Sequence, residues 1–258
     1  MTTIHVDNLS KSFQALDVLK NVNLRVNDGE FIVIFGPNGC GKSTLLNCIA
    51  GLDAPSQGSI TIGGKPVEDA KVGFVFQNFQ ESVFPWLTVL DNVAFALQVQ
   101  GVASEEARKN ALKFIEDIGL KAFANEFPYR LSGGMKQLVS IARARAYDPD
   151  VFLLDEPFSA LDYQNKIFAE EQLLKVWQES KKTTVFVSHD VEEAVFLADK
   201  VVVLSKRPSG VKKIIPIPLK RPRTIETRMR QEFFKLKNEV LAEFKKQLDS
   251  KITEKSVA

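Results

Sequence analysis

The segment Gly36–Ser43 constrains the fold of this chain more than any other. It reads Gly-Pro-Asn-Gly-Cys-Gly-Lys-Ser, which matches the pattern Gly-x-x-x-x-Gly-Lys-Ser. A continuous apolar run, Phe31–Phe35, precedes it, and Thr44–Ala50 follows with helical spacing and ends at Gly51. A strand, a glycine-rich loop and a helix in this order predict a loop whose backbone N–H groups converge on phosphate oxygens.

Each residue type in this loop has a chemical use. Glycines let the backbone approach an anion, Lys42 can reach terminal phosphates, and Ser43 can ligate Mg²⁺. The alternative is a glycine-rich turn that binds nothing, and the strand and helix on either side argue against it. We therefore expect the following residues to contact phosphate: Gly36, Pro37, Asn38, Gly39, Cys40, Gly41, Lys42, Ser43 and Thr44.

Composition excludes several classes of protein. The chain has 258 residues, of which 45% are hydrophobic and 26% charged, as in an ordinary globular domain. No apolar run approaches the roughly 20 residues of a spanning helix, and no signal peptide is evident, so we expect a protein that stays in the cytosol. The net charge of +2 gives no reason to expect nucleic acid as a partner. Cys40 and Cys48 stand without the companions that a disulfide framework or a zinc site would need.

The order of hydrophobic patterns predicts an α/β fold. Ile4 to Val26 alternates as a β-rich start, and apolar runs at Val72–Phe76, Val151–Leu154, Thr184–Val187 and Val201–Leu204 alternate with helical patterns. Such alternation predicts a parallel sheet. Helical patterns at Val93–Leu97 and Ala107–Ile118 predict an inserted helical part at about residues 80–145, within a domain that spans residues 1–219.

Two carboxylates follow one of the predicted strands. Asp155 and Glu156 end the run Val151–Leu154, and ligands of open α/β sheets bind at the carboxyl ends of the strands. Asp155 would hold a metal ion through water, while Glu156 would orient and deprotonate the water that attacks a γ-phosphate. The alternative is an acidic turn after a buried strand, which is common in proteins that lack a phosphate loop.

A second candidate anion site begins at Ser132. Ser132, Gly133 and Gly134 precede a segment of helical pattern, so they would lie at or near the N-terminus of a helix. A chain with one complete phosphate loop needs a second anion site only if two sites meet across a dimer. The alternative is a capped helix unrelated to nucleotide.

Taken together, these three segments closely resemble the motifs of ABC-type ATPases, and the resemblance covers about residues 2–210. It implies a P-loop NTPase fold with a RecA-like parallel core, an antiparallel β subdomain and a helical subdomain. It also implies ATP and Mg²⁺ as cofactors and a dimer in which Ser132, Gly133 and Gly134 contact the ATP of the partner protomer. By the same resemblance, Phe13 would stack on adenine, Gln77 would sense Mg²⁺ and water, Asp162 in Ser159–Asp162 would contact the opposite protomer, and His189 would lie near the γ-phosphate.

The resemblance therefore implies a set of roles. The catalytic group would comprise Lys42, Gln77, Glu156 and His189, and the metal would be held by Ser43, Gln77 and Asp155. Phe13 and Gln77 are single residues rather than motifs. Without the resemblance, Phe13 would be interpreted as a core aromatic and Gln77 as a polar residue at the end of a strand.

The stretch Glu81–Asp91 narrows the resemblance to importers of nitrate, taurine, alkyl sulfonates and bicarbonate. Such systems combine two ATPase subunits with membrane permease subunits and an extracytoplasmic substrate-binding protein, and their ATPase subunits sit at the cytoplasmic face of the inner membrane. Pro85 and Trp86 would face the groove that receives a short permease helix, unless Trp86 instead packs inside the helical block. The rival interpretations are a soluble ABC-type ATPase without a permease, such as an assembly scaffold, and a module that binds ATP without hydrolysing it.

This chain departs from the family pattern at three positions. Met135 stands where the signature usually has Gln, and Leu138 and Arg145 stand where members often carry Arg and Leu. We expect the protein to remain active with Met135 in place of Gln. A spacing of seven returns nearly to the same helix face, so we hypothesise that a charge has moved two turns along the helix.

The tail, residues 220–258, is basic and predicted to be helical. Its apolar residues at helical spacing form one stripe, which comprises Phe233, Leu236, Val240, Phe244 and Leu248. The helix could pack on its own domain, bind a partner subunit, or lie on an acidic membrane surface.

Overall fold

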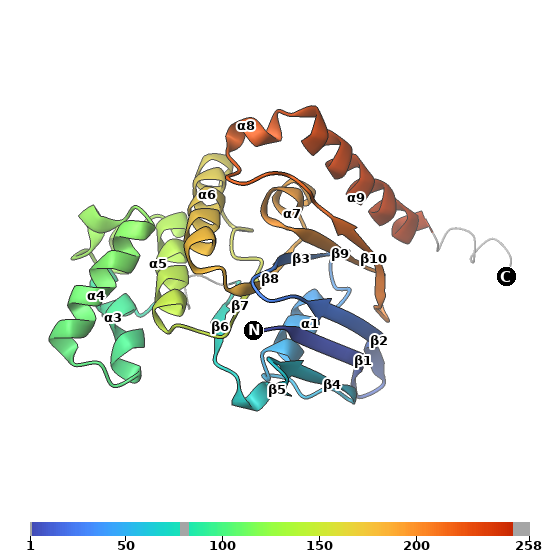
Figure 1. Ribbon diagram of the computed structural model, residues 1–258, viewed down its shortest axis with the longest axis horizontal. Coiled ribbons are helices and arrows are strands. Elements are labelled where there is room, and N and C mark those ends of the chain that lie inside the picture. Colours follow the sequence, from blue (N-terminus) through green and yellow to red (C-terminus); the bar gives the residue numbers. More distant parts are fainter. Residues whose placement is uncertain (1, 78–82, 250–258) are drawn as a thin grey trace, which may run out of the picture. The chain divides into compact units, whose positions relative to one another are not determined.

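The structure is a computed structural model that describes residues 2–77 and 83–249 (Figure 1). The chain forms two compact units, one made of Met1–Ala70 with Thr183–Ala258 and the other of Lys71–Lys182. Glu81 and Ser82, which open the stretch assigned to importers, lie outside the described residues, as do the tail residues from 250 onward.

The first unit begins with an antiparallel sheet in the order β2-β1-β4-β5. Its strands are β1 (Ile4–Phe13), β2 (Leu16–Val26), β4 (Gln57–Ile62) and β5 (Lys65–Pro66). The alternation in the sequence places Val6 opposite Leu24 on the buried face. Gly58 allows β1 and β4 to approach closely, because its φ is +85° and a Cβ there would lie 2.4 Å from the carbonyl oxygen of Asp7.

The second sheet region of this unit is mainly parallel. β3 (Phe31–Phe35) lies between and parallel to β8 (Thr183–Ser188) and β9 (Lys200–Leu204), and β10 (Val211–Pro216) pairs antiparallel with β9. All residues of β3 and β8 are buried. Strands covered on both faces need continuous apolar runs, which is why these strands could be predicted.

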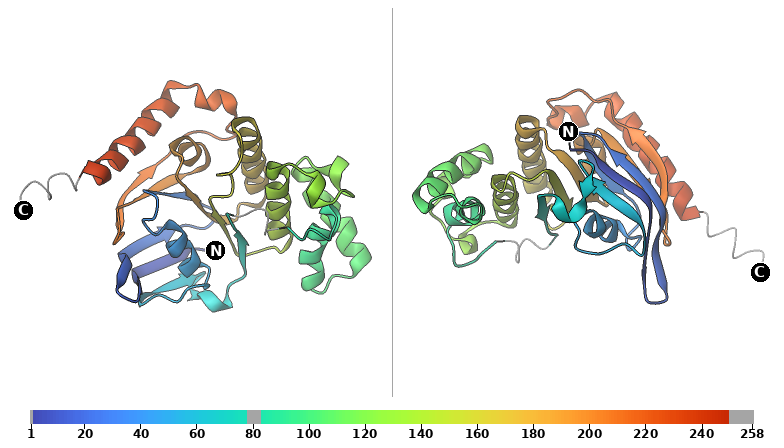
Figure 2. Two further views of the ribbon diagram at one scale, coloured as in Figure 1. Left: turned by 180° about the vertical axis from the view of Figure 1, so that it is seen from behind. Right: turned by 60° about the horizontal axis from the view of Figure 1, so that its bottom comes forward.

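The helices of the first unit are α1 (Lys42–Ile49), α7 (Val191–Leu197), α8 (Ile225–Arg228) and α9 (Gln231–Asp249), with a 3₁₀ turn η1 (Val67–Asp69). α9 runs beside β9 and contacts α7 (Figure 2). Phe233 and Val240 are buried, and the ring of Phe244 lies 5.1 Å from that of Phe35. The tail helix therefore packs on its own unit, the first of the alternatives above; the side chain of Leu248 lies outside the described residues.

The second unit contains two parallel strands and a group of helices. β6 (Val72–Val75) pairs with β7 (Val151–Asp155). α3 contacts both α4 and α5, and α5 also contacts α6. The helices are α3 (Val89–Val99), α4 (Ser104–Asp117), α5 (Gly133–Ala146) and α6 (Tyr163–Ser180), with 3₁₀ turns η2 (Lys121–Phe123) and η3 (Pro128–Arg130).

The helices have polar outer faces. α4, for example, buries Ala107, Ala111 and Ile115, which recur every four residues, and its other positions are exposed or half-buried. Within residues 2–77 and 83–249, no helix has both the length and the apolar character that a membrane span requires.

Candidate functional site

The predicted phosphate loop connects β3 to the N-terminus of α1. Gly41 has a φ of +112°, and a Cβ there would lie 2.8 Å from Cγ1 of Val18, so only glycine fits. The Nζ of Lys42 donates to the carbonyl oxygens of Gly36 at 3.1 Å and Pro37 at 3.3 Å, and its side chain is folded into the loop. Backbone N–H groups at the start of a helix and an ammonium group within the same loop form an arrangement suited to an anion.

Cys40 is a buried residue of the phosphate loop. It is 2% exposed, and burial raises the pKa of its thiol, while the charge of Lys42 acts in the opposite direction. The thiol is therefore neutral near pH 7, and it contributes volume rather than charge to the loop.

Phe13 ends β1 and is 44% exposed. The Nζ of Lys11 lies 4.7 Å from the centre of its ring, at the distance of a cation–π contact. An aromatic ring held on an exposed strand end is suited to stacking on a flat ligand.

His189 lies between two residues that are fixed by hydrogen bonds. Asp190 caps α7, because its carboxylate accepts from the N–H of Glu192 at 2.8 Å, and its own N–H donates to Oγ of Ser188 at 2.9 Å. Ser188 also bonds the buried Glu193. These bonds fix the backbone on both sides of His189, whose side chain is exposed at the end of β8.

Asp155 and Glu156 stand at the carboxyl end of β7 in the second unit. Asp155 is 8% exposed. Glu156 has a φ of +42°, a left-handed conformation that is uncommon for a residue with a side chain. Such conformations cluster at functional positions, and here the chain turns sharply just after the buried strand. Gln77 follows β6 in the same unit and is exposed.

Ser132 caps α5, as the sequence predicted for a residue at the helix N-terminus. Its Oγ accepts from the backbone N–H of Met135 at 3.3 Å. The cap uses only the backbone of Met135, so a Met side chain serves it as well as Gln would. Asp162 caps α6 in the same way, and hydrogen bonds from Asn165 hold the pKa of its carboxyl below the usual value.

The structure thus distributes the predicted residues between the two units. The first unit carries Phe13, Gly36–Thr44 and His189. The second unit carries Gln77, Ser132, Gly133, Gly134, Asp155, Glu156 and Asp162.

The second unit also has an apolar groove that motif analysis did not find. It has a volume of about 220 Å³ and is lined by residues of β6, α3 and α5, including Phe74, Phe95, Val99, Arg143 and Tyr147. The ring of Phe84 lies 5.1 Å from that of Phe95.

Trp86 extends this aromatic group. It is 70% exposed, and its ring lies 5.5 Å from that of Phe84. Trp86 is therefore displayed on the surface and is not packed inside the helical block. Exposed aromatics of this kind favour a protein partner.

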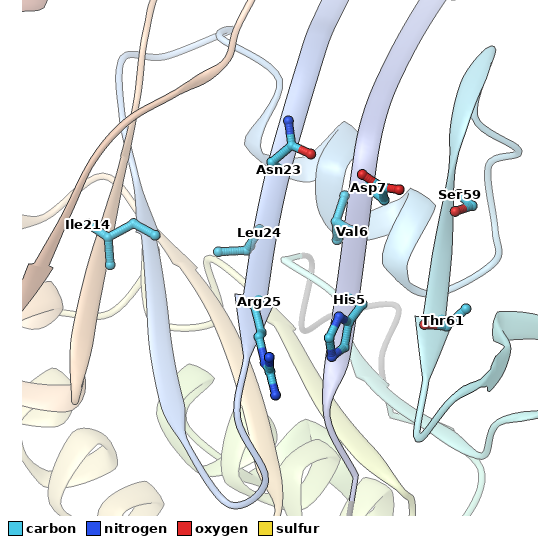
Figure 3. Close-up of a pocket in the computed structure, with 9 residues that line it drawn as sticks. All are labelled: His5, Val6, Asp7, Asn23, Leu24, Arg25, Ser59, Thr61 and Ile214. Carbon is cyan, nitrogen blue, oxygen red and sulfur yellow. The ribbon is translucent and has the colours of Figure 1, made fainter.

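A second concavity lies on the antiparallel sheet of the first unit (Figure 3). It has a volume of about 560 Å³ and is lined mainly by polar strand residues, among them His5, Asp7, Arg25 and Thr61. It is wide and open, and it contains none of the predicted site residues.

Sequence comparison places these features in a known family. The family model described as "ABC transporter" matches residues 19–159. An uncharacterised ABC transporter ATP-binding protein of Methanocaldococcus jannaschii is 46% identical over 92% of this chain and 90% of its own length. The nitrate import ATP-binding protein NrtD of Synechocystis is 44% identical over 86% of each chain, and the taurine import ATP-binding protein TauB of Yersinia pestis is 45% identical over 81% of this chain and 82% of its own.

Structural comparison agrees with the sequence. A dimeric ATP-binding cassette in a post-hydrolysis state, bound to ADP and Pi, has a TM-score of 0.73 and 36% sequence identity to this chain. The match covers 84% of this chain and all of that one. The predicted P-loop fold with a parallel core is thereby confirmed.

Proposed function

Because this chain belongs to the ABC transporter family, we propose that it binds and hydrolyses ATP to drive an importer of a small anion, of the nitrate, sulfonate, taurine or bicarbonate type. The observation that carries this proposal is the similarity, over more than four fifths of the chain, to ATP-binding proteins named for nitrate and taurine import. The transported anion itself would be selected by other subunits.

The loop Gly36–Thr44 supplies the groups that ATP binding needs. Its backbone N–H groups and the helix N-terminus attract phosphate, and the ammonium group of Lys42 can leave the carbonyl oxygens of Gly36 and Pro37 for phosphate oxygens. Phe13 would stack on the adenine ring.

The residues assigned to Mg²⁺ fit that ion. Ser43 is exposed at the start of α1, and the carboxylate of Asp155 ends β7, so both offer the oxygen ligands that Mg²⁺ prefers. In the part of the chain that the structure describes, no cluster of three or more His, Cys, Asp or Glu could hold a metal alone. Ser43, Gln77 and Asp155 would hold Mg²⁺, which would neutralise charge on the phosphates.

Glu156 is the proposed general base, which would take a proton from the attacking water. Its left-handed backbone turns the chain directly after the strand that carries Asp155. His189 would contact the γ-phosphate from a backbone that Ser188 and Asp190 hold in place.

We propose further that two such subunits bind ATP together. Ser132, Gly133 and Gly134 form a second helix N-terminus suited to an anion, and they and Asp162 would contact the ATP of the partner protomer. The similar cassette was solved as a dimer, which supports this arrangement. ATP would stabilise the closed pair, and hydrolysis would let it open.

The groove on the second unit is the proposed site for a permease subunit. Phe95 and Val99 are 41% and 61% exposed at its edge, which suits the apolar side of a short helix. Docking there would place the chain at the cytoplasmic face of the membrane, with a substrate-binding protein on the far side.

Purification of the chain from its native membrane with its companions tests this proposal. We expect mass spectrometry to identify a multi-spanning permease in the wild-type sample. The Val99→Asp variant should no longer co-purify with the permease. Its affinity for ATP should be unchanged, because the substitution is confined to the groove. Recovery of soluble companions alone would instead favour an ABC-type ATPase without a permease.

A further inference from the structure

We propose that Ser209 and Arg207, in the loop between β9 and β10, are positioning residues that hold the phosphate loop in the form that binds ATP. This inference rests on the proposal that Gly36–Ser43 binds the nucleotide phosphates. Both residues lie far from this loop in the sequence, and both bond its backbone.

The backbone of Ser209 is held in place by two hydrogen bonds to β2. Its N–H donates to the carbonyl oxygen of Val18 at 2.8 Å, and its own carbonyl accepts from the N–H of Lys20 at 2.8 Å. These bonds join the β9–β10 loop to β2, whose Val18 also packs against Gly41. The backbone of Ser209 is therefore bonded to the same strand that packs against the phosphate loop.

The side chain of Ser209 uses this fixed position. Ser209 is fully buried, and its Oγ bonds the carbonyl oxygen of Cys40 and lies 3.0 Å from that of Ser205. A buried hydroxyl with acceptors from both loops stabilises the contact between the loops. Loss of this hydroxyl would leave a buried carbonyl oxygen without its donor.

The bond to Cys40 also sets the direction of a neighbouring N–H group. In a planar trans peptide, the C=O and the N–H that follows it point in opposite directions. When Ser209 holds the carbonyl of Cys40, the N–H of Gly41 must point away from Ser209. Gly41 caps α1, so its N–H belongs to the group of donors that a helix N-terminus presents to an anion.

Arg207 acts on the preceding peptide. Its Nη2 donates to the carbonyl oxygen of Gly39, and a Cβ at Gly39 would lie 3.6 Å from the same nitrogen. This bond orients the N–H of Cys40, which donates to the carbonyl oxygen of Pro37 at 3.2 Å. Two consecutive peptides of the phosphate loop are thus anchored by residues of one distant loop.

Nucleotide affinity measured with Ser209→Ala tests the first anchor. We expect the Kd for ATP to rise about three- to tenfold, the effect of one hydrogen bond. Ser205→Ala is the matched control, because the Oγ of Ser205 accepts from the N–H of Gly210 within the β9–β10 loop, and no bond to the phosphate loop is removed. The control should keep its Kd within twofold of the wild type.

Arg207→Ala tests the second anchor without risk to the core, because Arg207 is exposed. We expect a smaller rise in Kd, and Lys206→Ala controls for the loss of one positive charge in the same loop. Amide hydrogen exchange at Cys40, whose N–H donates to the carbonyl oxygen of Pro37, should accelerate in Arg207→Ala but not in Lys206→Ala.

Two results would overturn the inference. One is an ATP Kd within twofold of wild type in both Ser209→Ala and Arg207→Ala, with only the melting temperature lowered. The other is an equal rise in Kd in the Ser205→Ala control. If the wild type itself, like Lys42→Ala, did not bind ATP, the proposed function would fail instead, so the two failures are distinguishable.

Discussion

At the scale of single residues, the buried guanidinium of Arg223 joins the segment after β10 to the end of α7. Its Nη1 donates to the carbonyl oxygens of Phe196 and Ala198 at 2.8 Å each, and its Nη2 donates to that of Leu219 at 3.1 Å. The last carbonyls of a helix lack intrahelical partners and favour a cation. Burial lowers the pKa of Arg223 to about 9, and Arg221 acts in the same direction, so these carbonyls compensate for a costly buried charge.

Arg223→Lys should therefore destabilise the chain although the charge is kept. A lysine cannot reproduce the planar fork that bonds several carbonyls at once, and we expect a loss of about 3 kcal/mol in the free energy of unfolding. Urea unfolding measures this loss. Arg230→Lys, at an exposed position of the same segment, should change it by less than about 0.5 kcal/mol. Equal midpoints for the two variants would contradict this account of Arg223.

At the scale of elements, α5 places Leu138 and Arg145 in different surroundings. Leu138 is 1% exposed in the core. Arg145 bonds Asp117 at 2.6 Å and Glu179 at 3.0 Å, so its charge is matched by acidic residues of α4 and α6. A charge could move along one face of the helix only if the two positions had equivalent surroundings. The surroundings of Leu138 and Arg145 are not equivalent.

Exchange of the two residues tests that hypothesis. Leu138→Arg would bury a charge, and Arg145→Leu would leave two carboxylates without their partner, so each single variant should lose about 2 kcal/mol or more. We expect the double variant to be less stable than either single variant in thermal unfolding. A double variant as stable as the wild type would establish compensation between the two positions.

The tail helix α9 depends on its buried stripe. Phe233 is 1% exposed, whereas the adjacent Phe234 is 46% exposed. Phe233→Ala should cost about 3–5 kcal/mol in the free energy of unfolding, because it leaves a cavity beneath the helix. Phe234→Ala removes the same atoms from a half-exposed site and should cost less than about 1.5 kcal/mol. Similar losses in chemical denaturation would show that α9 is not held by this stripe.

The elements that could be predicted are those whose sequence pattern matches their burial. Phe31–Phe35 and Val151–Leu154 are continuous apolar runs, and both form buried strands. β10 is an edge strand that contains Lys212, Lys213 and Pro216. Its apolar residues therefore do not recur at a regular spacing, and the sequence pattern did not predict it. β4 was missed as well, although the alternation of Ser59–Ile62 between glycines is a signal that could have identified it.

The same distinction applies to the candidate site. Glycines that must adopt positive φ, such as Gly41, form a local motif that can be recognised in the sequence. Ser209 and Arg207 could not be recognised, because their role depends on contacts across 168 or more residues. The groove was missed for a similar reason, since β6, α3 and α5 each contribute only part of it.

At the scale of the whole molecule, each unit carries only part of the residues assigned to ATP. The phosphate loop and His189 belong to one unit, and Glu156 and Ser132 belong to the other. If all of these act on the same reaction, ATP hydrolysis requires contributions from both units and from a partner protomer. Within this proposed reaction, Glu156 would act in hydrolysis and not in binding.

The most direct measurement is phosphate release from saturating ATP by Glu156→Gln, with the Kd for ATP determined on the same sample. We expect a rate lower by about 10²- to 10⁴-fold, the contribution of a general base, with the Kd within about twofold of wild type. Glu116→Gln, at an exposed carboxylate of the same unit, should leave both quantities unchanged. Hydrolysis at the wild-type rate, or an equal loss of binding and hydrolysis, would show that Glu156 is not the general base.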